Sequence, residues 1–521
     1  MLEYYFYGAG LRFGQSIVFA SLWILIGLFI ASVFRYMLGP EKVRSLFGNG
    51  TRRGIFTGWL MGMLLPVCSL GVIPIVREMY RSGVKGGTII AFALTAPLFN
   101  PMSVLYGLTL SDPIAIIAFT LCALVIVTLL GVLWDWYYSD SNADPITEKM
   151  PTPGIKRVAA VVHGMCRELT GVSGALIVLG IIGSVLMAIS FEKGHLQSEV
   201  ERDNWLAPIN VAAIALPIYS TPLLAMSQIG GMFQHGNSIG AAFSLLILGA
   251  GANIGVVAWF VVTFGWRRTV TFLAVLSATT IALAYAVDKP LYPKGIEPAG
   301  HSHAFDVYTH PFHRQQLEYG SLMKSRMATF WEDNELGGTS ILGGFFLLGL
   351  VLRMVGAKRI EPWFYTGGDK KNTGFDIYVP EWTLGATAVL GLVSASVAGT
   401  FLYYPSPEQL LPDMFNVNTE CVLTSRSKNW EAAEKHITHC DNLSRRLEVG
   451  VFLRNGSVDP FMSAKAKTYR EKLDLLKQAV EGRDEDNIDK LAMDVSNSYL
   501  RLSTAFKGKG EFKGAEDPDT P

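Results

Sequence analysis

Apolar stretches without a charged residue alternate with short polar turns along most of the chain. They lie at Ser16–Phe34, Gly54–Val76, Gly86–Ser111, Pro113–Trp134, Leu169–Phe191, Asn204–Trp266, Thr269–Val287, Gly337–Leu352 and Trp382–Pro407. A helix needs roughly 20 apolar residues to cross the hydrocarbon core of a membrane. The pattern predicts an all-α polytopic membrane protein with about 8–10 membrane segments, some of them broken.

The last hundred or so residues follow a different pattern, hydrophilic overall with apolar positions at helical spacing. One such face holds Trp430, Ala433, Ile437 and Cys440. We expect a soluble helical bundle at 406–506 and a disordered tail at 507–521. Cys421 and Cys440 are the only cysteines of this part, and a disulfide and two buried thiols are both open.

Composition supports the membrane interpretation. The 521 residues are 50% hydrophobic and 17% charged, with a mean hydropathy of +0.31, which is too apolar for an ordinary soluble enzyme. The net charge is zero and no basic tract with interleaved aromatic residues occurs, so no nucleic-acid partner is expected. Membrane lipids are the expected surroundings, a homo-oligomer is left open, and no cofactor is predicted.

Two parts of the chain share an outline that indicates an internal duplication. The matching positions are Pro66 and Pro217, Ser69 and Ser220, Gly83 and Gly236, Gly87 and Gly240, and Asn100 and Asn253. We therefore divide the chain into a membrane core at 1–287 with repeats at about 1–137 and 168–287. An external His-containing loop at 288–338 and two additional transmembrane helices at 339–405 follow.

Each repeat contains prolines and glycines inside an apolar stretch, which break a membrane helix. Basic residues flank the first broken stretch on both sides, at Lys42, Arg44, Arg52 and Arg53 and at Arg77, Arg81 and Lys85. Because basic loops face the cytoplasm, this stretch is predicted to be a re-entrant hairpin. Acidic residues precede the second stretch, which predicts a hairpin from the opposite face and thus an inverted repeat. Full crossings are the alternative.

Polar residues at the breaks are the candidate substrate-binding residues. They are Cys68, Ser69, Asn100, Tyr219, Ser220 and Asn253. Their thiol, hydroxyl and amide groups would line a polar cavity near mid-membrane for a small-molecule or ion substrate. For Cys68 the alternative is a small buried apolar residue, and for the two asparagines it is hydrogen bonding between helices.

The external loop offers a second candidate site. His301, His303, His310 and His313 lie close together, and imidazoles bind zinc, copper or nickel. Their spacing matches no defined site, so a solvated loop is the alternative.

The stretch from Pro66 to Pro101, PVCSLGVIPIVREMYRSGVKGGTIIAFALTAPLFNP, resembles the signature of the predicted permease family that includes the organoarsenical efflux permeases. The resemblance extends roughly from Gln15 to Val287. It implies a multi-pass permease of the inner (plasma) membrane that exports a small solute or a metal or metalloid compound. Independently of the resemblance, the distribution of basic residues predicts that the C-terminal bundle lies on the external side. The spans hold no catalytic constellation, so no enzyme is predicted.

Members that handle arsenicals read Cys-Ser-Cys where this chain reads Cys68-Ser69-Leu70, so capture of arsenic by two thiolates at this motif is not available. The alternative function is a membrane-anchored sensor whose external bundle binds a ligand.

Overall fold

A computed structural model describes residues 2–48, 51–138, 150–152, 154–193, 195–196, 198–292, 303–312, 314, 319–331, 335–365 and 381–507. Its regular elements are helices, and no strand occurs among these residues. The chain divides into two compact units. Unit 1 is Met1–Gly107 with Ser111–Ser396, and unit 2 is Leu108–Leu110 with Val397–Pro521.

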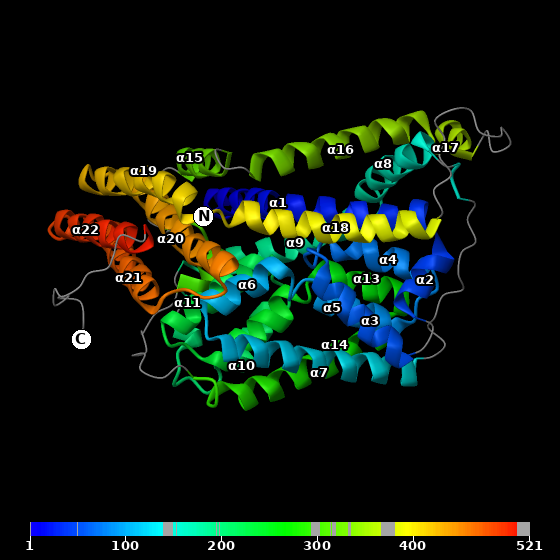
Figure 1. Cartoon of the computed structure of the whole chain (residues 1–521), viewed down its shortest axis with the longest axis horizontal. Helices are drawn as coiled ribbons and strands as arrows, with labels where there is room; N and C mark the ends of the chain where they lie inside the picture. The colour runs from blue at the N-terminus through cyan, green and yellow to red at the C-terminus, as the bar shows by residue number, and fades with distance from the viewer. Residues whose placement is uncertain are drawn as a thin grey trace. The chain divides into compact units, whose positions relative to one another are not determined.

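The helices of unit 1 fall into three groups along the chain (Figure 1). The first holds α1 (Leu2–Val33), a π-helical turn η1 (Phe34–Leu38), α2 (Pro40–Phe47), α3 (Thr51–Leu64), α4 (Val72–Arg81), α5 (Gly86–Thr95), α6 (Pro101–Leu110) and α7 (Pro113–Tyr137). The second holds α8 (Ile155–Leu169), α9 (Val172–Ser190), η3 (Ser198–Val200), α10 (Ala207–Ala215), α11 (Pro222–Gln234), α12 (Ile239–Ser244), η4 (Leu245–Ala250), α13 (Ile254–Phe264) and α14 (Trp266–Asp288). Then come η5 (His303–Tyr308), α15 (Tyr319–Trp331), α16 (Glu335–Val355) and α17 (Ala357–Tyr365), while α18 (Glu381–Tyr403) runs into unit 2.

Several of these helices can cross a membrane. Among the described residues, five are long and apolar enough: Leu2–Leu38, Pro113–Tyr137, Val172–Ser190, Trp266–Asp288 and Gly337–Val355. The helix pair Ile239–Ala250 and Ile254–Phe264, bent by 55°, would make a sixth. The polytopic membrane class predicted from the sequence is thereby confirmed, whereas the count of 8–10 segments stays a prediction.

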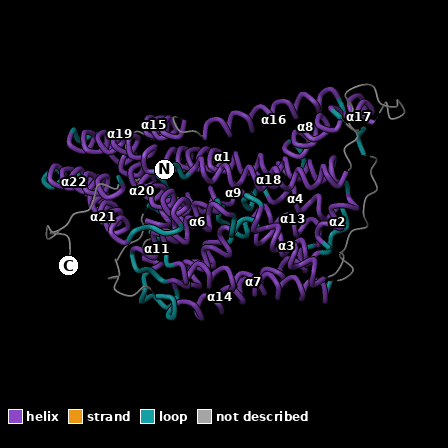
Figure 2. The backbone as a smooth tube through the Cα atoms, in the orientation of Figure 1, coloured by secondary structure: helices purple, strands orange, loops and turns teal. Residues whose placement is uncertain are grey.

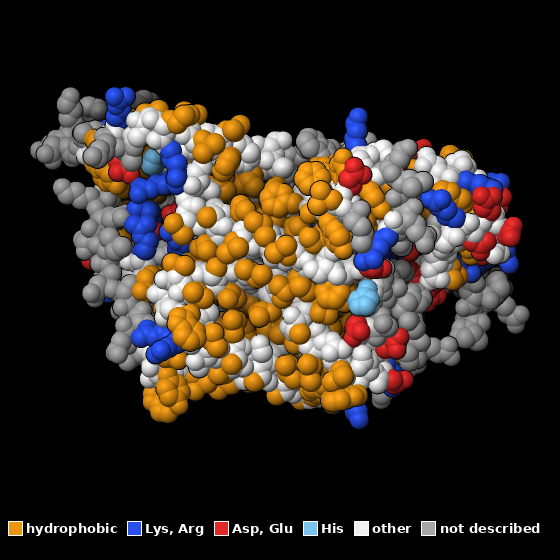
Figure 3. Space-filling model, turned by 180° about the vertical axis from the view of Figure 1, so that it is seen from behind, with side chains coloured by type: hydrophobic (Ala, Val, Ile, Leu, Met, Phe, Trp, Pro, Cys, Tyr) orange, Lys and Arg blue, Asp and Glu red, His pale blue; other side chains and the backbone are white. Residues whose placement is uncertain are grey.

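An apolar outer surface fits a lipid environment. On α7, Ile114, Ile117, Leu121, Val125 and Leu129 recur every three or four residues and are each at least 40% exposed. Exposure of such a stripe to water would be unfavourable, and soluble monomers rarely expose contiguous apolar patches of this size. Figure 3 shows apolar side chains over much of the visible face, with the charged side chains lying mostly toward its two ends.

The helices α7 and α14 pack against each other and run in opposite directions (Figure 1). Trp134, near the end of α7, lies with its ring 6.1 Å from that of Phe272, near the beginning of α14. The guanidinium of Arg268 lies 5.1 Å above the ring of Tyr138, which directly follows α7. The two helices therefore end at opposite ends of unit 1.

One tight contact occurs at the end of each of these two helices. The Gly87 amide donates to the Asp135 carboxylate at 2.7 Å, and the Gly240 amide donates to Asp288 at 2.7 Å, with a separation of 48 residues in both cases. Each carboxylate thus faces the first turn of a helix, α5 or α12, where the helix dipole favours negative charge.

Unit 2 contains four helices, α19 (Pro407–Arg426), α20 (Trp430–Asn455), α21 (Pro460–Gly482) and α22 (Ile488–Phe506). Each packs against its neighbours in sequence, and α19 also packs against α22. Their shared core includes Leu447, Leu473, Val495 and Leu502. Cys421 and Cys440 are free, fully buried thiols that lie against each other.

Candidate functional site

The first break lies between α3 and α4, at residues 65–71, and is buried throughout. Pro66 has no amide hydrogen and cannot continue the helix. The turn is closed by the Gly71 amide, which donates to the Cys68 sulfur at 3.3 Å, and by the Val72 amide, which donates to the Cys68 carbonyl at 2.9 Å. It also packs directly on α1, since a Cβ on Gly27 would lie 2.0 Å from the Gly71 carbonyl oxygen.

The second break lies between α10 and α11, at residues 216–221. Thr221 caps α11 by accepting a hydrogen bond from the Leu224 amide at 3.2 Å, and Pro222 occupies the first helical position. The buried Ser220 hydroxyl donates to the Thr221 carbonyl at 3.2 Å. This tip therefore presents hydroxyls, whereas the first presents a thiol and the Ser69 hydroxyl.

The two helices of the first broken segment, α3 and α4, contact the same region of the chain. The Thr57 hydroxyl, near the start of α3, donates to the carbonyl of Phe47 at the end of α2. In the second half of α4, Arg77 pairs with Glu168 at 2.6 Å, and the same carboxylate lies 4.0 Å from Arg35 in the turn before α2. The two ends of the segment are thus neighbours of the 35–47 region.

The two ends of the second broken segment likewise contact one region, which is the end of α14 and the residues that follow it. The Trp205 carbonyl, just before α10, accepts from the Tyr285 hydroxyl at 2.7 Å. The Gly236 carbonyl, just after α11, accepts from the Tyr292 hydroxyl. Both tyrosines belong to the last turn of α14 or the residues that follow it.

Asn100 and Asn253 cap the helices that follow two further breaks, at 96–100 and 251–253. The Asn100 side-chain oxygen accepts from the Ser103 amide at 2.8 Å, and the Asn253 oxygen accepts from the Val256 amide at 3.0 Å. Sequence reasoning considered ligand contact and bonding between helices but missed this capping role. The sequence Asn100-Pro101 was a usable signal, because Asn is a favoured N-cap and Pro a favoured first residue.

The breaks meet in the interior of unit 1, where Figure 2 shows loop segments among the helices. Tyr219 lies against Cys68. The side chains of Leu70 and Asn253 come within 2.6 and 2.9 Å of the position that a Cβ on Gly180 would take. The glycine on α9 thus leaves room for residues of two different breaks. Of the candidate residues from separate repeats, Cys68 and Tyr219 lie together.

Each of the four breaks contributes one buried polar atom without a hydrogen-bond partner among the described residues. These atoms are Ser69 Oγ, Asn100 Nδ2, the Tyr219 hydroxyl and Asn253 Nδ2, on residues at most 5% exposed. Unpaired hydroxyls also occur on regular helices such as α5, but these four lie on irregular backbone. An unsatisfied buried polar group costs about 1–3 kcal/mol, and more than nine in ten such groups are paired in folded proteins.

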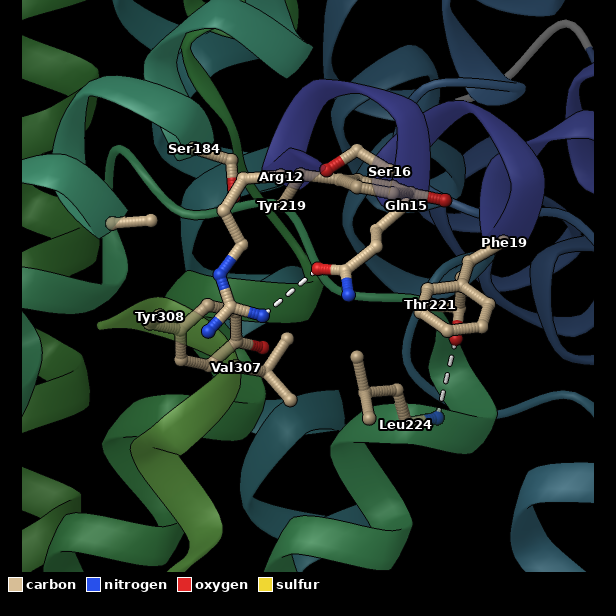
Figure 4. A pocket seen from close by; sticks show the side chains of 11 residues that line it. Arg12, Gln15, Ser16, Phe19, Ser184, Tyr219, Thr221, Leu224, Val307 and Tyr308 are labelled. Carbon is tan, nitrogen blue, oxygen red and sulfur yellow. Dashed lines mark hydrogen bonds between the residues drawn. The ribbon is translucent and has the colours of Figure 1, made fainter. Parts of the chain in front are cut away.

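A pocket opens beside the second break (Figure 4). It holds about 400 Å³ of empty space, part of it open to solvent, between α1, α9, the second break and η5. Arg12, Ser184, Tyr219, Thr221 and Tyr308 contribute to its polar wall. Burial raises the pKa of Tyr308 to about 12, so its hydroxyl stays neutral and donates to Gln228 at 3.1 Å.

Arg12 was not among the candidates, because the first apolar run was taken to begin at Ser16. The structure continues the helix back to Leu2 and so places Arg12 on the wall of the pocket. A lone arginine four residues before a long apolar run was the available signal.

Of the four histidines predicted as a metal site, the structure describes only some. His301, His313 and the side chain of His303 lie outside the described residues. His310 is fully buried, stacked on the Tyr4 ring at 3.5 Å, with Nε2 3.2 Å from the Tyr4 carbonyl. Within the described part of the chain no group of three or more His, Cys, Asp or Glu could hold a metal ion, so a metal site stays a prediction.

Comparison with known proteins places the chain in a family. A family profile described as a predicted permease matches residues 11–289, more than half of the chain. A 90-residue stretch is 31% identical to the UPF0718 protein YcgR of Bacillus subtilis and covers 17% of this chain and 31% of that protein.

A stretch of 88 residues is 31% identical to the "Putative two-component membrane permease complex subunit" of Streptococcus mutans, and covers 17% of this chain and 29% of that protein. The chain thus matches less than a third of the length of either relative. No solved structure matches it.

Proposed function

The chain belongs to the predicted permease family, and from this premise we propose that it moves a small solute across the membrane through the cluster of four helix breaks. The observation that carries the proposal is the set of four unpaired polar atoms, one from each break. A passing solute or water would supply their missing partners. Irregular backbone at membrane depth is tolerated where it lines such a cavity.

We further propose that the two halves form an inverted repeat of re-entrant hairpins. Three observations support this architecture. The ends of each broken segment lie together, each half has the same Gly–Asp contact, and α7 and α14 run in opposite directions. Rocking of one half against the other would then expose the breaks alternately to the two sides.

The proposed direction is export across the inner membrane, with the first hairpin entering from the cytoplasm. The basic residues around that hairpin support this orientation, since positive loops stay inside. Unit 2 would then lie on the external side, and the substrate class is a small solute or a metal or metalloid compound.

The test is accumulation in everted membrane vesicles. The panel contains a trivalent methylarsenical, arsenite, and divalent zinc, copper and nickel, and compares wild type with Cys68→Ala and Ser69→Ala. Cys122→Ala is the matched control, because it removes a thiol from α7 away from the breaks. We expect one compound to accumulate and both break variants to lose most of that uptake. Uptake that both variants preserve would place the site elsewhere.

A membrane-anchored sensor is the second candidate, favoured by the separate core of unit 2. Removal of the residues after Pro407 discriminates the two: a sensor loses its function, whereas a permease keeps transport. The name of the Streptococcus mutans relative also suggests a partner chain, which co-purification from the native membrane would reveal.

A further inference from the structure

The first broken segment is fastened by an ion pair to the turn between α8 and α9. Arg77 on α4 lies eight residues after Ser69 of the break and pairs with Glu168 at 2.6 Å. The buried Ser173 hydroxyl bonds to both groups, since it accepts from Arg77 and donates to Glu168. Glu168 lies in the last turn of α8 and Ser173 in the first turn of α9, so the pair joins α4 to two helices outside the broken segment.

The second broken segment has a contact at the corresponding position. Ser220 matches Ser69, and Gln228 on α11 follows it by the same eight residues. The Gln228 side-chain oxygen accepts a hydrogen bond from the Tyr308 hydroxyl at 3.1 Å, and both residues are buried. Tyr308 belongs to η5, outside the broken segment. The helix after each break is therefore held from outside at the same step along the chain, by charge in the first half and by a neutral hydrogen bond in the second.

Each of these contacts lies at the wall of a pocket. Tyr308 lines the pocket beside the second break (Figure 4). Glu168 lines another pocket, with about 250 Å³ of empty space, part of it open to solvent, between α1, η1, α4 and α8. Arg35, Arg167 and Glu78 add charged groups to the wall of this second pocket. Both contacts therefore stand between a broken segment and a space that water can enter.

The ion pair is able to separate at low cost. The Arg77 and Glu168 side chains are 23% and 17% exposed, so water reaches both of them. Ion pairs with access to water contribute little to stability and are screened by salt. The turn between α8 and α9 is also held from its other side, because Arg353 of α16 donates to the Thr170 hydroxyl at 3.1 Å. Loss of the pair would therefore free α4, which begins directly after the first break, rather than the turn.

We propose that Arg77 and Glu168 form a charge-based gate on the first hairpin, the counterpart of the neutral contact between Gln228 and Tyr308 on the second. The intact pair holds α4 in place, and its separation opens the first break, with Cys68, to solvent. This inference rests on the proposed function, because a gate of this kind serves the alternate exposure of the breaks. Opening of the gate can nevertheless be measured without transport.

The test is the rate at which a membrane-permeant maleimide labels Cys68 in the full-length protein in lipid nanodiscs, read by peptide mass spectrometry. Cys122 on α7 is the reference thiol in the same sample. At low salt we expect Arg77→Gln and Glu168→Gln each to raise the labelling of Cys68 about fivefold relative to Cys122, the effect of losing one ion pair. The double variant should match the single variants, because all three lack the same interaction.

Arg167→Gln is the matched control. It removes an ion pair of the same length, 2.6 Å, from the same turn, but its partner Glu361 lies on α17 rather than on α4. The labelling of Cys68 in this variant should equal that of wild type. Salt provides a test that needs no substitution: higher ionic strength should speed the labelling of wild type and of Tyr308→Phe, but not that of Glu168→Gln.

Four results would overturn the gate. They are unchanged labelling of Cys68 in both single variants, an equal rise in Arg167→Gln, an equal rise at Cys122, and a double variant that is labelled several times faster than either single variant. The vesicle assay separates this inference from the permease. Labelling that depends on the pair in a protein that moves no solute keeps the gate and counts against transport, whereas transport with unchanged labelling in the variants does the reverse.

Discussion

The two broken segments share the same contacts between helices but differ at their tips. In both halves a glycine amide in the first turn of a helix meets an aspartate 48 residues later, and an asparagine caps the helix after the next break. The first tip, around Cys68, is packed against α1 and fully buried. The second tip, around Tyr219 and Thr221, borders a pocket.

This difference shows which features the architecture requires and which can vary. The Gly–Asp contact fixes the distance between helices, so both halves need it. The tips can diverge because their surroundings differ: Gly71 lies against Gly27 of α1, whereas Pro217 lies near Gly183 of α9.

The largest effect on stability is expected at Gly87 and Gly240, where the packing leaves no room for an added atom. A Cβ on Gly87 would lie 2.3 Å from the Gly131 carbonyl oxygen, and one on Gly240 would lie 2.7 Å from that of Ala284. Because backbone cannot move aside cheaply, Gly87→Ala should cost on the order of 3 kcal/mol and Gly240→Ala less. The readout is the yield and unfolding temperature of the detergent-solubilised protein.

Gly231→Ala is the control for both variants, since nothing lies within 4 Å of a Cβ there and α11 should gain from alanine. If Gly87→Ala is as stable as this control, the two halves do not depend on the close approach.

The next largest effect on stability is expected from loss of the Asp135 and Asp288 carboxylates. Asp135→Ala leaves the Gly87 amide without its acceptor, and Asp288→Ala deprives both the Gly240 amide and the Ser238 hydroxyl. Each lost acceptor costs about 1–3 kcal/mol, so Asp288→Ala should be the more destabilising. Asparagine at either position keeps the oxygen and should recover most of the loss in thermal unfolding. If Asp135→Ala were the more destabilising of the two variants, the two Gly–Asp contacts would not contribute equally to stability.

The sequence was sufficient to predict the membrane class, the broken stretches and the family, because charge-free runs and interrupting prolines are local signals. It also identified Gly87 with Gly240 and Asn100 with Asn253. It could not pair Gly87 with Asp135, since that contact depends on the packing of α5 against α7. Arg12 was missed for a similar reason: its place at the pocket depends on η5, which lies almost 300 residues later.

A smaller effect on stability should separate capping from ligand binding at the asparagines. Asn100→Ser and Asn253→Ser keep a side-chain oxygen for the cap, so each should cost only a few tenths of a kcal/mol. Both remove the unpaired amide nitrogen, and transport in vesicles should fall well below that of wild type. Asn100→Ala loses the cap and should cost about 1 kcal/mol. Full transport by the serine variants would limit the asparagines to a structural role.

The smallest effect on stability concerns residues 303–312, which cover the second tip. Residues 303–312 hold Tyr308 at the pocket, and the His310 ring anchors them against α1. Burial lowers the pKa of His310 below its usual value near 6.5, and the nearby Arg12 and Arg314 lower it further. The folded state therefore binds fewer protons, and the stabilisation is lost as the pH falls below about 6.5.

Thermal unfolding at pH 7.5 and 5.5 measures this loss. His310→Phe keeps a ring on Tyr4 without a titrating group and should reduce the difference between the two temperatures, whereas the exposed His195→Phe should preserve it. An unchanged difference in His310→Phe would mean that the cover is not held by the neutral imidazole. The contrast between the two tips would then rest on the pocket alone.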